Sequence, residues 1–308
     1  MNVSLYRYWL FVMVLITMSS CFKFRVSDTK AYQLFGQNQT NFHISRYKMG
    51  DSTMRYLEIA NDTLPTVVFI HGGLGTALTF KKYLKDTLLQ KKYAMIAVDR
   101  YGHGYSDFGH TETNVRRQAE MIIPILKKLN LDKKTPTILV GYSFGGTIAA
   151  RIAMDCPDCV DELILAAPAI DPQNEKKFWF NKPMDWWGFK WFLPQNFIIA
   201  NDEKLAHASE CAKMMPFWGK IVVPTVYIHG KNDGIVPFAN YRFARKMLKN
   251  ESTQYIVKDT LPHVFVEENT MVLRNVILDV DVKSKSFFSK KERQIEQKGN
   301  VKMGFDKE

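Results

Sequence analysis

Gly141-Tyr142-Ser143-Phe144-Gly145-Gly146 is the stretch of sequence that decides the fold. It follows the short apolar run Thr137–Val140, which predicts a strand, and it precedes Thr147–Met154, which predicts a helix. A serine between two glycines at such a turn projects its hydroxyl above the edge of the sheet, because the tight bend leaves little room for side chains. The helix behind the turn favours negative charge at its N-terminus. We therefore expect Ser143 to be a nucleophile.

Short apolar strands alternate with helices on both sides of this turn. Such alternation predicts a mostly parallel sheet covered by helices on both faces, so the expected fold class is α/β. In sheets of this kind, functional sites lie at the carboxyl ends of the strands. The other expected strands are Phe42–Met49, Met54–Ala60, Thr66–Ile70, Ala94–Val98, Glu162–Ala166, Thr225–His229 and Thr253–Val257, and the other expected helices are Ala77–Lys92, Asn114–Leu131 and Ala239–Leu248.

Two residues far along the chain could activate the serine. A serine hydroxyl is a poor nucleophile unless a base takes its proton, and that base must be oriented by a third group. Asp233 lies just after the expected strand Thr225–His229, and His263 lies after Thr253–Val257. We expect Ser143, Asp233 and His263 to be the catalytic residues. Five of the six other histidines lie well before Asp233 in the chain. The sixth, His229, belongs to the strand that leads into the acid loop.

A glycine-rich loop follows the expected strand Thr66–Ile70 and reads His71-Gly72-Gly73-Leu74-Gly75. Acyl transfer needs backbone N–H groups aimed at the oxyanion of the tetrahedral intermediate. We expect these donors to be the N–H groups of Phe144 and Gly73, with Leu74 as the second choice for the loop. A glycine-rich loop can also cradle phosphate, but no Gly-Lys-Ser/Thr follows this one.

Together with Asp99-Arg100-Tyr101-Gly102-His103-Gly104-Tyr105-Ser106, these motifs resemble the α/β-hydrolase family, in its cap-bearing, single-domain form. The resemblance spans roughly residues 66–270 in register and includes the family's chain order of serine, acid and histidine. It implies that Asp99–Ser106 shapes the mouth of the pocket and does no chemistry. It also implies a cap inserted after Ala166-Ala167-Pro168.

The expected cap, residues 171–220, carries five of the six tryptophans of the chain. Its inner face is expected to line an apolar pocket, although the aromatic residues could also simply pack a small helical subdomain. The residues expected to line the pocket are His71, Leu74, Tyr142, Trp179, Trp187, Trp191 and Val264.

The resemblance also bears on the reaction. Related epoxide hydrolases and haloalkane dehalogenases have aspartate at the nucleophile position, so Ser143 implies acyl transfer without a metal or organic cofactor. Carboxylesterases, monoacylglycerol lipases, carbon–carbon-bond hydrolases and proline iminopeptidases share these motifs. The aromatic cap favours an apolar ester or a monoacyl lipid as substrate. Two other functions remain open. The protein could be an aminopeptidase, which would need a carboxylate near the cap to bind the substrate amine. It could also be a binding protein that has the hydrolase fold but no catalytic turnover. The carboxylates available are Glu175, Asp185, Glu203 and Glu210.

The N-terminus predicts an export signal. The apolar run Trp9–Met18 is shorter than the roughly 20 residues that cross a bilayer and has the length of a signal-peptide core. Met18-Ser19-Ser20-Cys21 resembles a bacterial lipoprotein signal, which implies cleavage before Cys21 and its lipidation. A plain secretory signal or an uncleaved anchor remains open. We expect a protein of the cell envelope, lipid-anchored or exported.

The net charge of +11 is concentrated at the ends of the 308-residue chain. Residues 61–282 hold 27 basic and 24 acidic residues, so most of the excess lies outside the hydrolase motifs. This distribution disfavours nucleic acid as a partner and suits an anionic membrane. The expected segments are a signal at 1–21, a linker at 22–41, the core at 42–170 and 221–282, the cap at 171–220 and a lysine-rich tail at 283–308.

Four cysteines are too few for a disulfide scaffold. Cys156-Pro157-Asp158-Cys159 ends an expected helix, whereas a redox motif would precede one. We expect a turn there, with a local disulfide if the protein is exported. Cys211 is expected to be a buried thiol.

Overall fold

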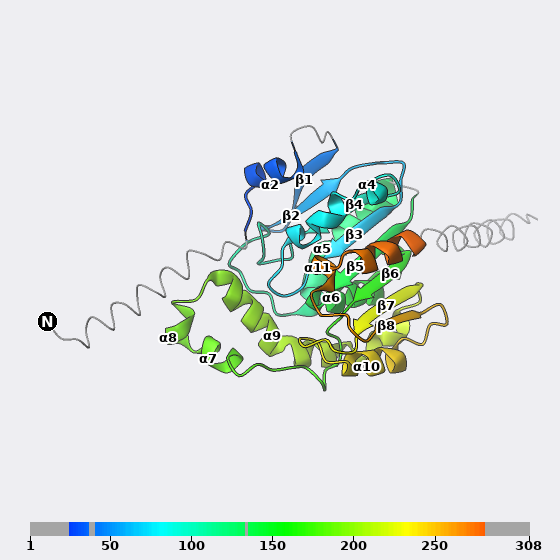
Figure 1. The fold of residues 1–308 in the computed structure, drawn as a ribbon. Helices are drawn as coiled ribbons and strands as arrows, with labels where there is room; N and C mark the ends of the chain where they lie inside the picture. The colour runs from blue at the N-terminus through cyan, green and yellow to red at the C-terminus, as the bar shows by residue number, and fades with distance from the viewer. Residues whose placement is uncertain (1–24, 37–40, 133–134, 281–308) are drawn as a thin grey trace, which may run out of the picture.

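The computed structural model describes residues 25–36, 41–132 and 135–280. At its centre is a sheet with the strand order β1-β2-β4-β3-β5-β6-β7-β8 (Figure 1). The pairs β1–β2 and β2–β4 are antiparallel and the other pairs are parallel, which confirms the expected α/β architecture. The strands are β1 (Phe42–Met49), β2 (Ser52–Ile59), β3 (Thr66–Ile70), β4 (Ala94–Val98), β5 (Thr137–Tyr142), β6 (Glu162–Ala166), β7 (Thr225–Gly230) and β8 (Gln254–Lys258).

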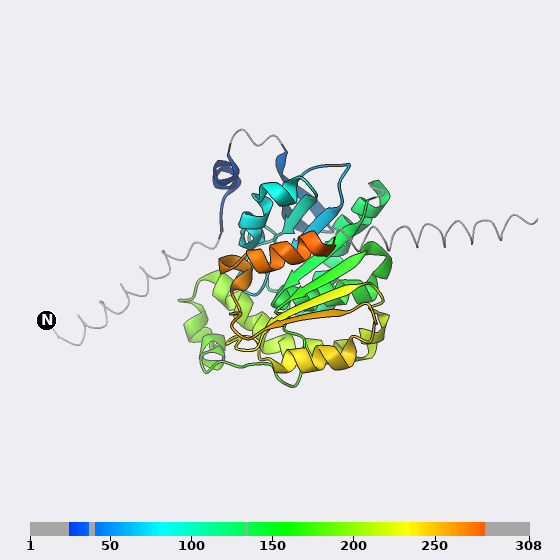
Figure 2. The same ribbon diagram turned by 45° about the vertical axis from the view of Figure 1, so that its right-hand side comes forward.

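Helices cover both faces of the sheet, as the two ribbon views show (Figures 1 and 2). One face packs against α5 (Val115–Asp132), α6 (Phe144–Asp155) and α10 (Ala239–Met247). The other packs against η1 (Ala77–Phe80), α3 (Lys81–Leu84), α4 (Thr87–Gln90), α11 (Phe265–Glu268) and a helix over 271–280. Along β3, Val67 and Phe69 enter one core and Val68 and Ile70 the other, which explains its unbroken apolar run.

Two of the expected helices differ from the structure by more than one residue at an end. The helix expected over Ala77–Lys92 is broken into η1, α3 and α4, because the Asp86 side chain accepts hydrogen bonds from the N–H groups of Leu88 and Leu89 and starts a new helix there. The helix expected from Thr147 starts at Phe144, directly after the turn that contains Ser143.

The linker expected over residues 22–41 is wrong in part, because α2 (Asp28–Phe35) lies within it. The Ser27 side chain caps this helix by accepting a hydrogen bond from the N–H of Lys30. Phe35 stacks on Phe42 of β1, with ring centroids 4.1 Å apart. The burial of one apolar face therefore holds this segment on the sheet. The signal, Cys21 and the lysine-rich tail lie outside the described residues.

Between β6 and β7 the chain forms four further helices, α7 (Asn181–Asp185), α8 (Trp187–Lys190), α9 (Gln195–Met214) and η3 (Met215–Lys220). We call residues 171–220 the cap. Figure 1 shows α7, α8 and α9 together at one side of the molecule. After α6, a disulfide joins Cys156 and Cys159 across η2 (Pro157–Cys159). Within the described residues, no helix combines the length and the apolar composition that a membrane span requires.

Candidate active site

The turn between β5 and α6 places Ser143 at the carboxyl end of a central strand. Its backbone φ is 54°, in the left-handed region that most side chains avoid. A Cβ at Gly145 would lie 2.2 Å from the carbonyl oxygen of Ile70, and one at Gly141 would lie 2.5 Å from the carbonyl oxygen of Gly145. Only glycine fits at these two positions, so the sequence pattern around the serine is a steric requirement of the turn.

The structure brings Ser143, Asp233 and His263 together from three strand ends. The hydroxyl of Ser143 lies 3.0 Å from Nε2 of His263, and Nδ1 of that imidazole lies 2.7 Å from Oδ2 of Asp233. In the tautomer with a proton on Nδ1, the imidazole donates to the carboxylate and accepts the serine proton on Nε2. This is the geometry that general-base activation of a serine requires.

Asp233 is held ionised beside the imidazole. Its Oδ1 accepts hydrogen bonds from the N–H groups of Ile235 and Val236, each at 2.8 Å. Burial by itself would raise the pKa of Asp233, but the hydrogen bonds from His263 and from these two N–H groups outweigh it and lower the pKa below its ordinary value. The carboxylate therefore stays charged and opposes any rotation of the His263 ring.

His229, the other histidine near the acid, has a structural role. Its Nδ1 accepts a hydrogen bond from the hydroxyl of Tyr227 at 2.8 Å, and its Nε2 donates to the carbonyl oxygen of Val236 at 3.1 Å. Burial lowers the pKa of His229, so the ring is neutral. Both of its nitrogens are engaged in these bonds, which leaves His263 as the histidine in contact with Ser143.

The expected oxyanion donors border the same space as the serine. Gly73 and Phe144 both line the cavity in front of Ser143. Among the described residues, neither backbone N–H makes a hydrogen bond. The glycine loop passes directly against Ser143, since a Cβ at Gly72 would lie 3.0 Å from Cβ of Ser143. Two backbone donors are thus free to face a ligand at this point.

A largely apolar cavity of about 930 Å³ opens in front of Ser143. Of the residues expected to line it, Leu74, Tyr142 and Val264 do so. The hydroxyl of Tyr142 also donates to the carbonyl oxygen of His263 at 3.2 Å, which supports the loop that carries the imidazole. From the cap, the apolar lining residues are Phe178, Phe180, Met184, Phe192, Leu193 and Phe197.

The tryptophans expected in the pocket are not among its lining residues. Trp179, Trp187 and Trp191 are 87%, 73% and 83% exposed. Phe178 and Phe180 both face the cavity and stack on each other with centroids 5.3 Å apart, so Trp179 between them is directed outward. The aromatic side chains of the cap are therefore divided between an inner and an outer face, and sequence composition alone does not show this division.

His71 is also absent from the cavity wall. It is fully buried beneath the glycine loop, where Nδ1 donates to the carbonyl oxygen of Gly72 at 2.8 Å and Nε2 accepts from the N–H of Arg100 at 3.1 Å. Burial, assisted by the nearby Arg100 charge, lowers the pKa of His71 well below its ordinary value. The neutral ring supports the loop from behind.

A charged cluster in the cavity wall, formed by Glu175, Lys204 and His207, was not predicted from the sequence. Nδ1 of His207 lies 3.1 Å from Oε2 of Glu175, and Lys204 donates to the other carboxylate oxygen. Burial opposes the charged imidazole, but contacts with Cys211 and Glu175 outweigh it and raise the pKa of His207 to about 10. The spacing of Ala200, Lys204 and His207 along one face of α9 was the available signal.

A second charged pair joins the cap to the core. Arg100 donates to both carboxylate oxygens of Glu203 on α9, at 2.6 and 2.9 Å, and all of these groups are buried. Glu210 accepts a hydrogen bond from the N–H of Val115, and Asp185 forms an ion pair with Lys190. The four carboxylates that could have bound a substrate amine are therefore all engaged with groups of the protein.

No group of three or more histidine, cysteine, aspartate or glutamate side chains suited to a metal ion occurs within residues 25–36, 41–132 and 135–280.

Comparison with known proteins identifies the fold. Residues 65–190 match the family described as alpha/beta hydrolase fold. The hydrolase YugF of Bacillus subtilis, described as uncharacterized, is 31% identical over 126 residues, 40% of this chain and 43% of that protein. The sn-1-specific diacylglycerol lipase ABHD11 of Mus musculus is 31% identical over 104 residues, 33% of this chain and 32% of that protein. The matches thus span less than half of the length of these relatives.

Solved structures resemble most of this chain. A lipase-esterase related protein from Clostridium acetobutylicum superposes with a TM-score of 0.58 at 19% identity, covering 73% of this chain and 98% of that one. A membrane phospholipase A described as a bacterial virulence factor superposes with a TM-score of 0.59 at 19% identity, covering 89% and 98%. At such low identity these likenesses concern the fold.

Proposed function

For this chain, which has the α/β-hydrolase fold, we propose the function of a serine hydrolase that cleaves an apolar carboxylic ester or a monoacyl lipid. The observation that carries the proposal is the series of hydrogen bonds that joins Ser143, His263 and Asp233. Ser143, at one end of the series, borders the apolar cavity. The relatives named as lipases and esterases support the same class of reaction.

The proposed mechanism follows from the contacts of these groups. His263 takes the proton of Ser143 as Oγ attacks the ester carbonyl, and Asp233 stabilises the imidazolium that forms. The oxyanion accepts hydrogen bonds from the N–H groups of Gly73 and Phe144. The imidazolium then gives its proton to the leaving alcohol, which departs and leaves an acyl-enzyme. A water molecule deprotonated by His263 attacks this ester, and the acid is released as Ser143 regains its proton.

The cavity favours an apolar acyl group as substrate. Its wall is built mainly from apolar side chains of the cap and the core loops. Its volume of about 930 Å³ is typical of sites that bind small molecules. Aminopeptidase activity is less well supported, because Glu175 and Glu203 in the wall already pair with Lys204 and Arg100. A carboxylate that binds a substrate amine would have to be free of such partners.

Replacing the nucleophile tests the proposal. Ser143→Ala is expected to lower the turnover of p-nitrophenyl butyrate by roughly 10⁴-fold or more, because the acyl-enzyme can no longer form. The matched control is Ser209→Ala, an exposed serine of α9 outside the cavity, which should keep full activity. A fluorophosphonate probe should label the wild type and the control but not Ser143→Ala. Undiminished turnover in Ser143→Ala would remove the assignment.

We also propose that the protein is exported and lipidated on Cys21. The apolar run before Ser19-Ser20-Cys21 supports the proposal, and so does the disulfide between Cys156 and Cys159, a type of bond that persists in oxidising compartments. Mass spectrometry of the mature N-terminus should find acylated Cys21 as the first residue. A mature protein that still begins with Met1 would contradict the cleavage.

A further inference from the structure

The outer face of the cap exposes a group of large aromatic side chains. We call this group the cap aromatic surface, and it consists of Trp179, Phe180, Trp186, Trp187, Trp191 and Phe192. Within the group, Trp179 contacts Phe180 edge-on and Trp186 lies against Trp187, with centroids 5.9 and 5.7 Å apart. Exposed apolar patches of this kind mark surfaces that bind a partner or a membrane.

This surface is continuous with the substrate cavity. Phe180 and Phe192 are both exposed and both line the cavity in front of Ser143. A ligand that leaves an apolar phase in contact with the cap aromatic surface could therefore reach Ser143 along an apolar wall. A protein partner on this surface would instead cover the entrance.

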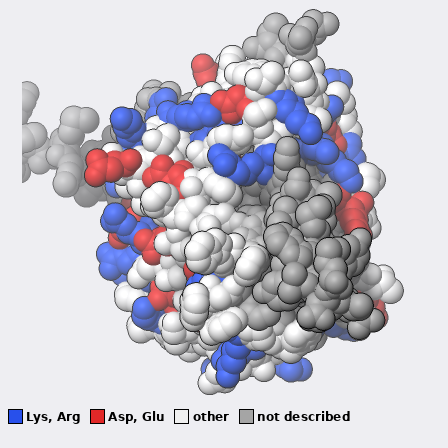
Figure 3. All heavy atoms as spheres, turned by 90° about the vertical axis from the view of Figure 1, so that its left-hand side faces the viewer, with Lys and Arg blue, Asp and Glu red and all other residues white. Residues whose placement is uncertain are grey.

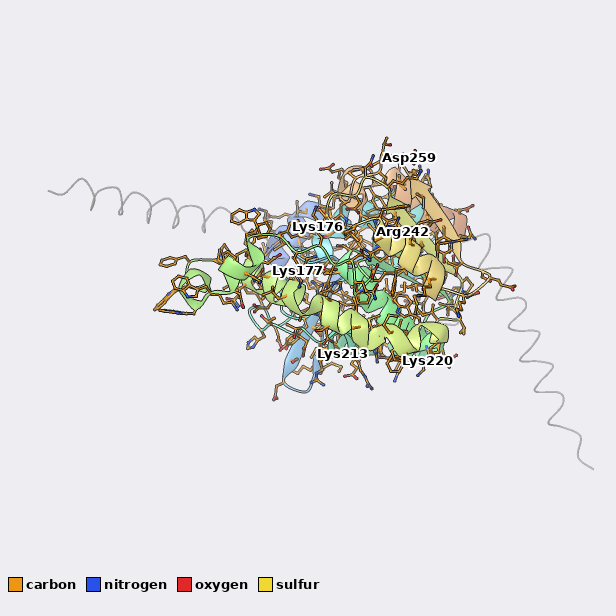
Figure 4. All side chains as sticks on the ribbon, turned by 90° about the horizontal axis from the view of Figure 1, so that it is seen from below. Lys176, Lys177, Lys213, Lys220, Arg242 and Asp259 are labelled. Carbon is orange, nitrogen blue, oxygen red and sulfur yellow. A yellow bond between two sulfur atoms is a disulfide. The ribbon has the colours of Figure 1, made fainter. Side chains whose placement is uncertain are left out.

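The charges around the surface suit an anionic partner. Residues 176–194 contain four lysines and one aspartate, Asp185, which pairs with Lys190. Lys177 and Lys182 are exposed beside the aromatic residues. Figure 3 shows uncharged side chains in the middle of this side of the molecule, with charged ones, many of them lysine or arginine, around them. Figure 4 places Lys176 and Lys177 on the segment that leads to the cap helices.

The described part of the N-terminal segment also reaches this side of the molecule. Arg25 donates to the carbonyl oxygen of Gly104 and stacks over the ring of Phe108, 4.1 Å from its centroid. The next residue, Gly109, accepts a hydrogen bond from the side chain of Gln195, at the start of α9 and close to Trp191 in the chain.

We propose that the cap aromatic surface docks on the headgroup region of an anionic lipid bilayer, with its tryptophans in the interface and the cavity opening toward the lipid. Tryptophan is enriched at membrane interfaces because its ring is apolar while its N–H can still reach water or a headgroup. The lysines add electrostatic attraction to anionic headgroups. The proposal rests on the proposed hydrolase function only for the identity of the substrate, a lipid ester drawn from the bilayer.

Vesicle binding by the full chain tests the docking. The triple variant Trp179→Ser/Trp187→Ser/Trp191→Ser should bind vesicles of phosphatidylcholine and phosphatidylglycerol at least about tenfold more weakly than the wild type, because less apolar area enters the interface. The control Leu88→Ser/Val222→Ser/Met271→Ser removes three exposed apolar side chains elsewhere and should bind like the wild type. Lys177→Gln/Lys182→Gln should weaken binding by about fivefold per lysine, and only to the anionic vesicles.

Fluorescence separates the cap from the N-terminal segment, which could hold the chain on vesicles by itself. Lipids brominated near the headgroup should quench tryptophan fluorescence of the wild type and of Ser143→Ala equally, and should quench the triple variant much less. Equal vesicle binding and equal quenching of wild type and triple variant would overturn the proposal. So would light scattering that shows a wild-type dimer which the triple variant does not form, because the surface would then bind a second copy.

Activity measurements keep the docking and the hydrolase proposals apart. The triple variant should keep wild-type turnover of p-nitrophenyl butyrate, since its three residues do not line the cavity, and should lose turnover of a monoacyl lipid in vesicles. Ser143→Ala should bind vesicles normally and turn over neither ester. Vesicle binding without any turnover by the wild type would contradict the hydrolase and leave the docking supported.

Discussion

Asp233 uses both of its carboxylate oxygens in the site. Oδ1 accepts hydrogen bonds from two backbone N–H groups of its own loop, and Oδ2 accepts one from His263. The loop thereby fixes the carboxylate, and the carboxylate fixes the imidazole, before any substrate binds. At the residue scale the orientation of His263 is therefore set by backbone groups that no sequence motif displays.

Asp233→Asn tests this arrangement. An amide that keeps the loop hydrogen bonds can present its NH₂ to Nδ1, which would move the imidazole proton to Nε2 and leave no acceptor for Ser143. We expect kcat for p-nitrophenyl butyrate to fall by roughly 10³- to 10⁴-fold. Asp259→Asn, an exposed loop residue paired with Lys231, is the matched control and should have wild-type kcat. A loss of less than tenfold in Asp233→Asn would show that the acid does not orient the base.

The turn between β5 and α6 decides where Ser143 points. Gly145 has no room for a Cβ because it packs against the carbonyl oxygens of Ile70 and His71, and Gly141 has none because the turn folds back on it through the carbonyl oxygen of Gly145. Because the turn joins a buried strand to a buried helix, neither side can move away to relieve a clash.

Gly145→Ala measures that constraint at the scale of the element. The added Cβ would meet the carbonyl oxygens of Ile70 and His71 at 2.2 and 2.5 Å, so we expect the free energy of unfolding to fall by about 2–3 kcal/mol, with loss of the proposed turnover of p-nitrophenyl butyrate. Gly219→Ala is the control, because a Cβ added there would meet nothing within 4 Å and stability should be nearly unchanged. Urea unfolding of both variants makes the comparison, and equal midpoints would refute the steric argument.

The helices of the cap differ in how they are attached to the core. Helix α9 is fastened to the core through Glu203, Glu210 and His207, each buried and each in polar contact with a core residue, namely Arg100, Val115 and Thr147. Helices α7 and α8 have few buried residues, and the cap aromatic surface consists of Trp187 on α8 and of residues that directly flank these two helices. The same insertion thus closes the cavity with its inner face and leaves its outer face to a partner.

For the molecule as a whole, the pair Arg100–Glu203 joins the cap to the sheet. Burial by itself would raise the pKa of Glu203, but the Arg100 guanidinium and the contact with His103 outweigh it, and the pKa lies well below its ordinary value. A carboxylate with a lowered pKa contributes stability that is present above the pKa of the unfolded chain, about 4.5 or slightly less, and is lost as the pH falls toward the folded pKa.

Glu203→Gln should lower the free energy of unfolding at pH 7 by about 3 kcal/mol, because Arg100 is left buried without a charged partner. Glu120→Gln removes an exposed partner of Arg116 on α5 and should have little effect. Below pH 4.5 the wild type should lose stability more steeply than Glu203→Gln, so that the difference between them narrows. Thermal unfolding of the three proteins from pH 3 to pH 7 measures this, and a difference that does not change with pH would contradict it.

The alternation of strands and helices was predictable along nearly the whole core, because apolar periodicity is a local property of the chain. The nucleophile turn was predictable for the same reason, since its glycines and serine are consecutive. The N-terminal helix α2 was not predictable, because most of its residues are polar or exposed and only two are buried. Only the contact between Phe35 and Phe42 shows which part of the sheet it packs on.

The sequence by itself determined the α/β-hydrolase fold and the three residues that we propose as the catalytic serine, acid and base, because each of these three follows a recognisable strand. The tertiary structure alone decided which aromatic residues of the cap face the cavity and which face outward. It also decided that His229 is engaged elsewhere, that Glu175 and Glu203 are paired, and that His71 lies under the loop. These outcomes depend on contacts between segments far apart in the chain, and local pattern carries no information about such contacts.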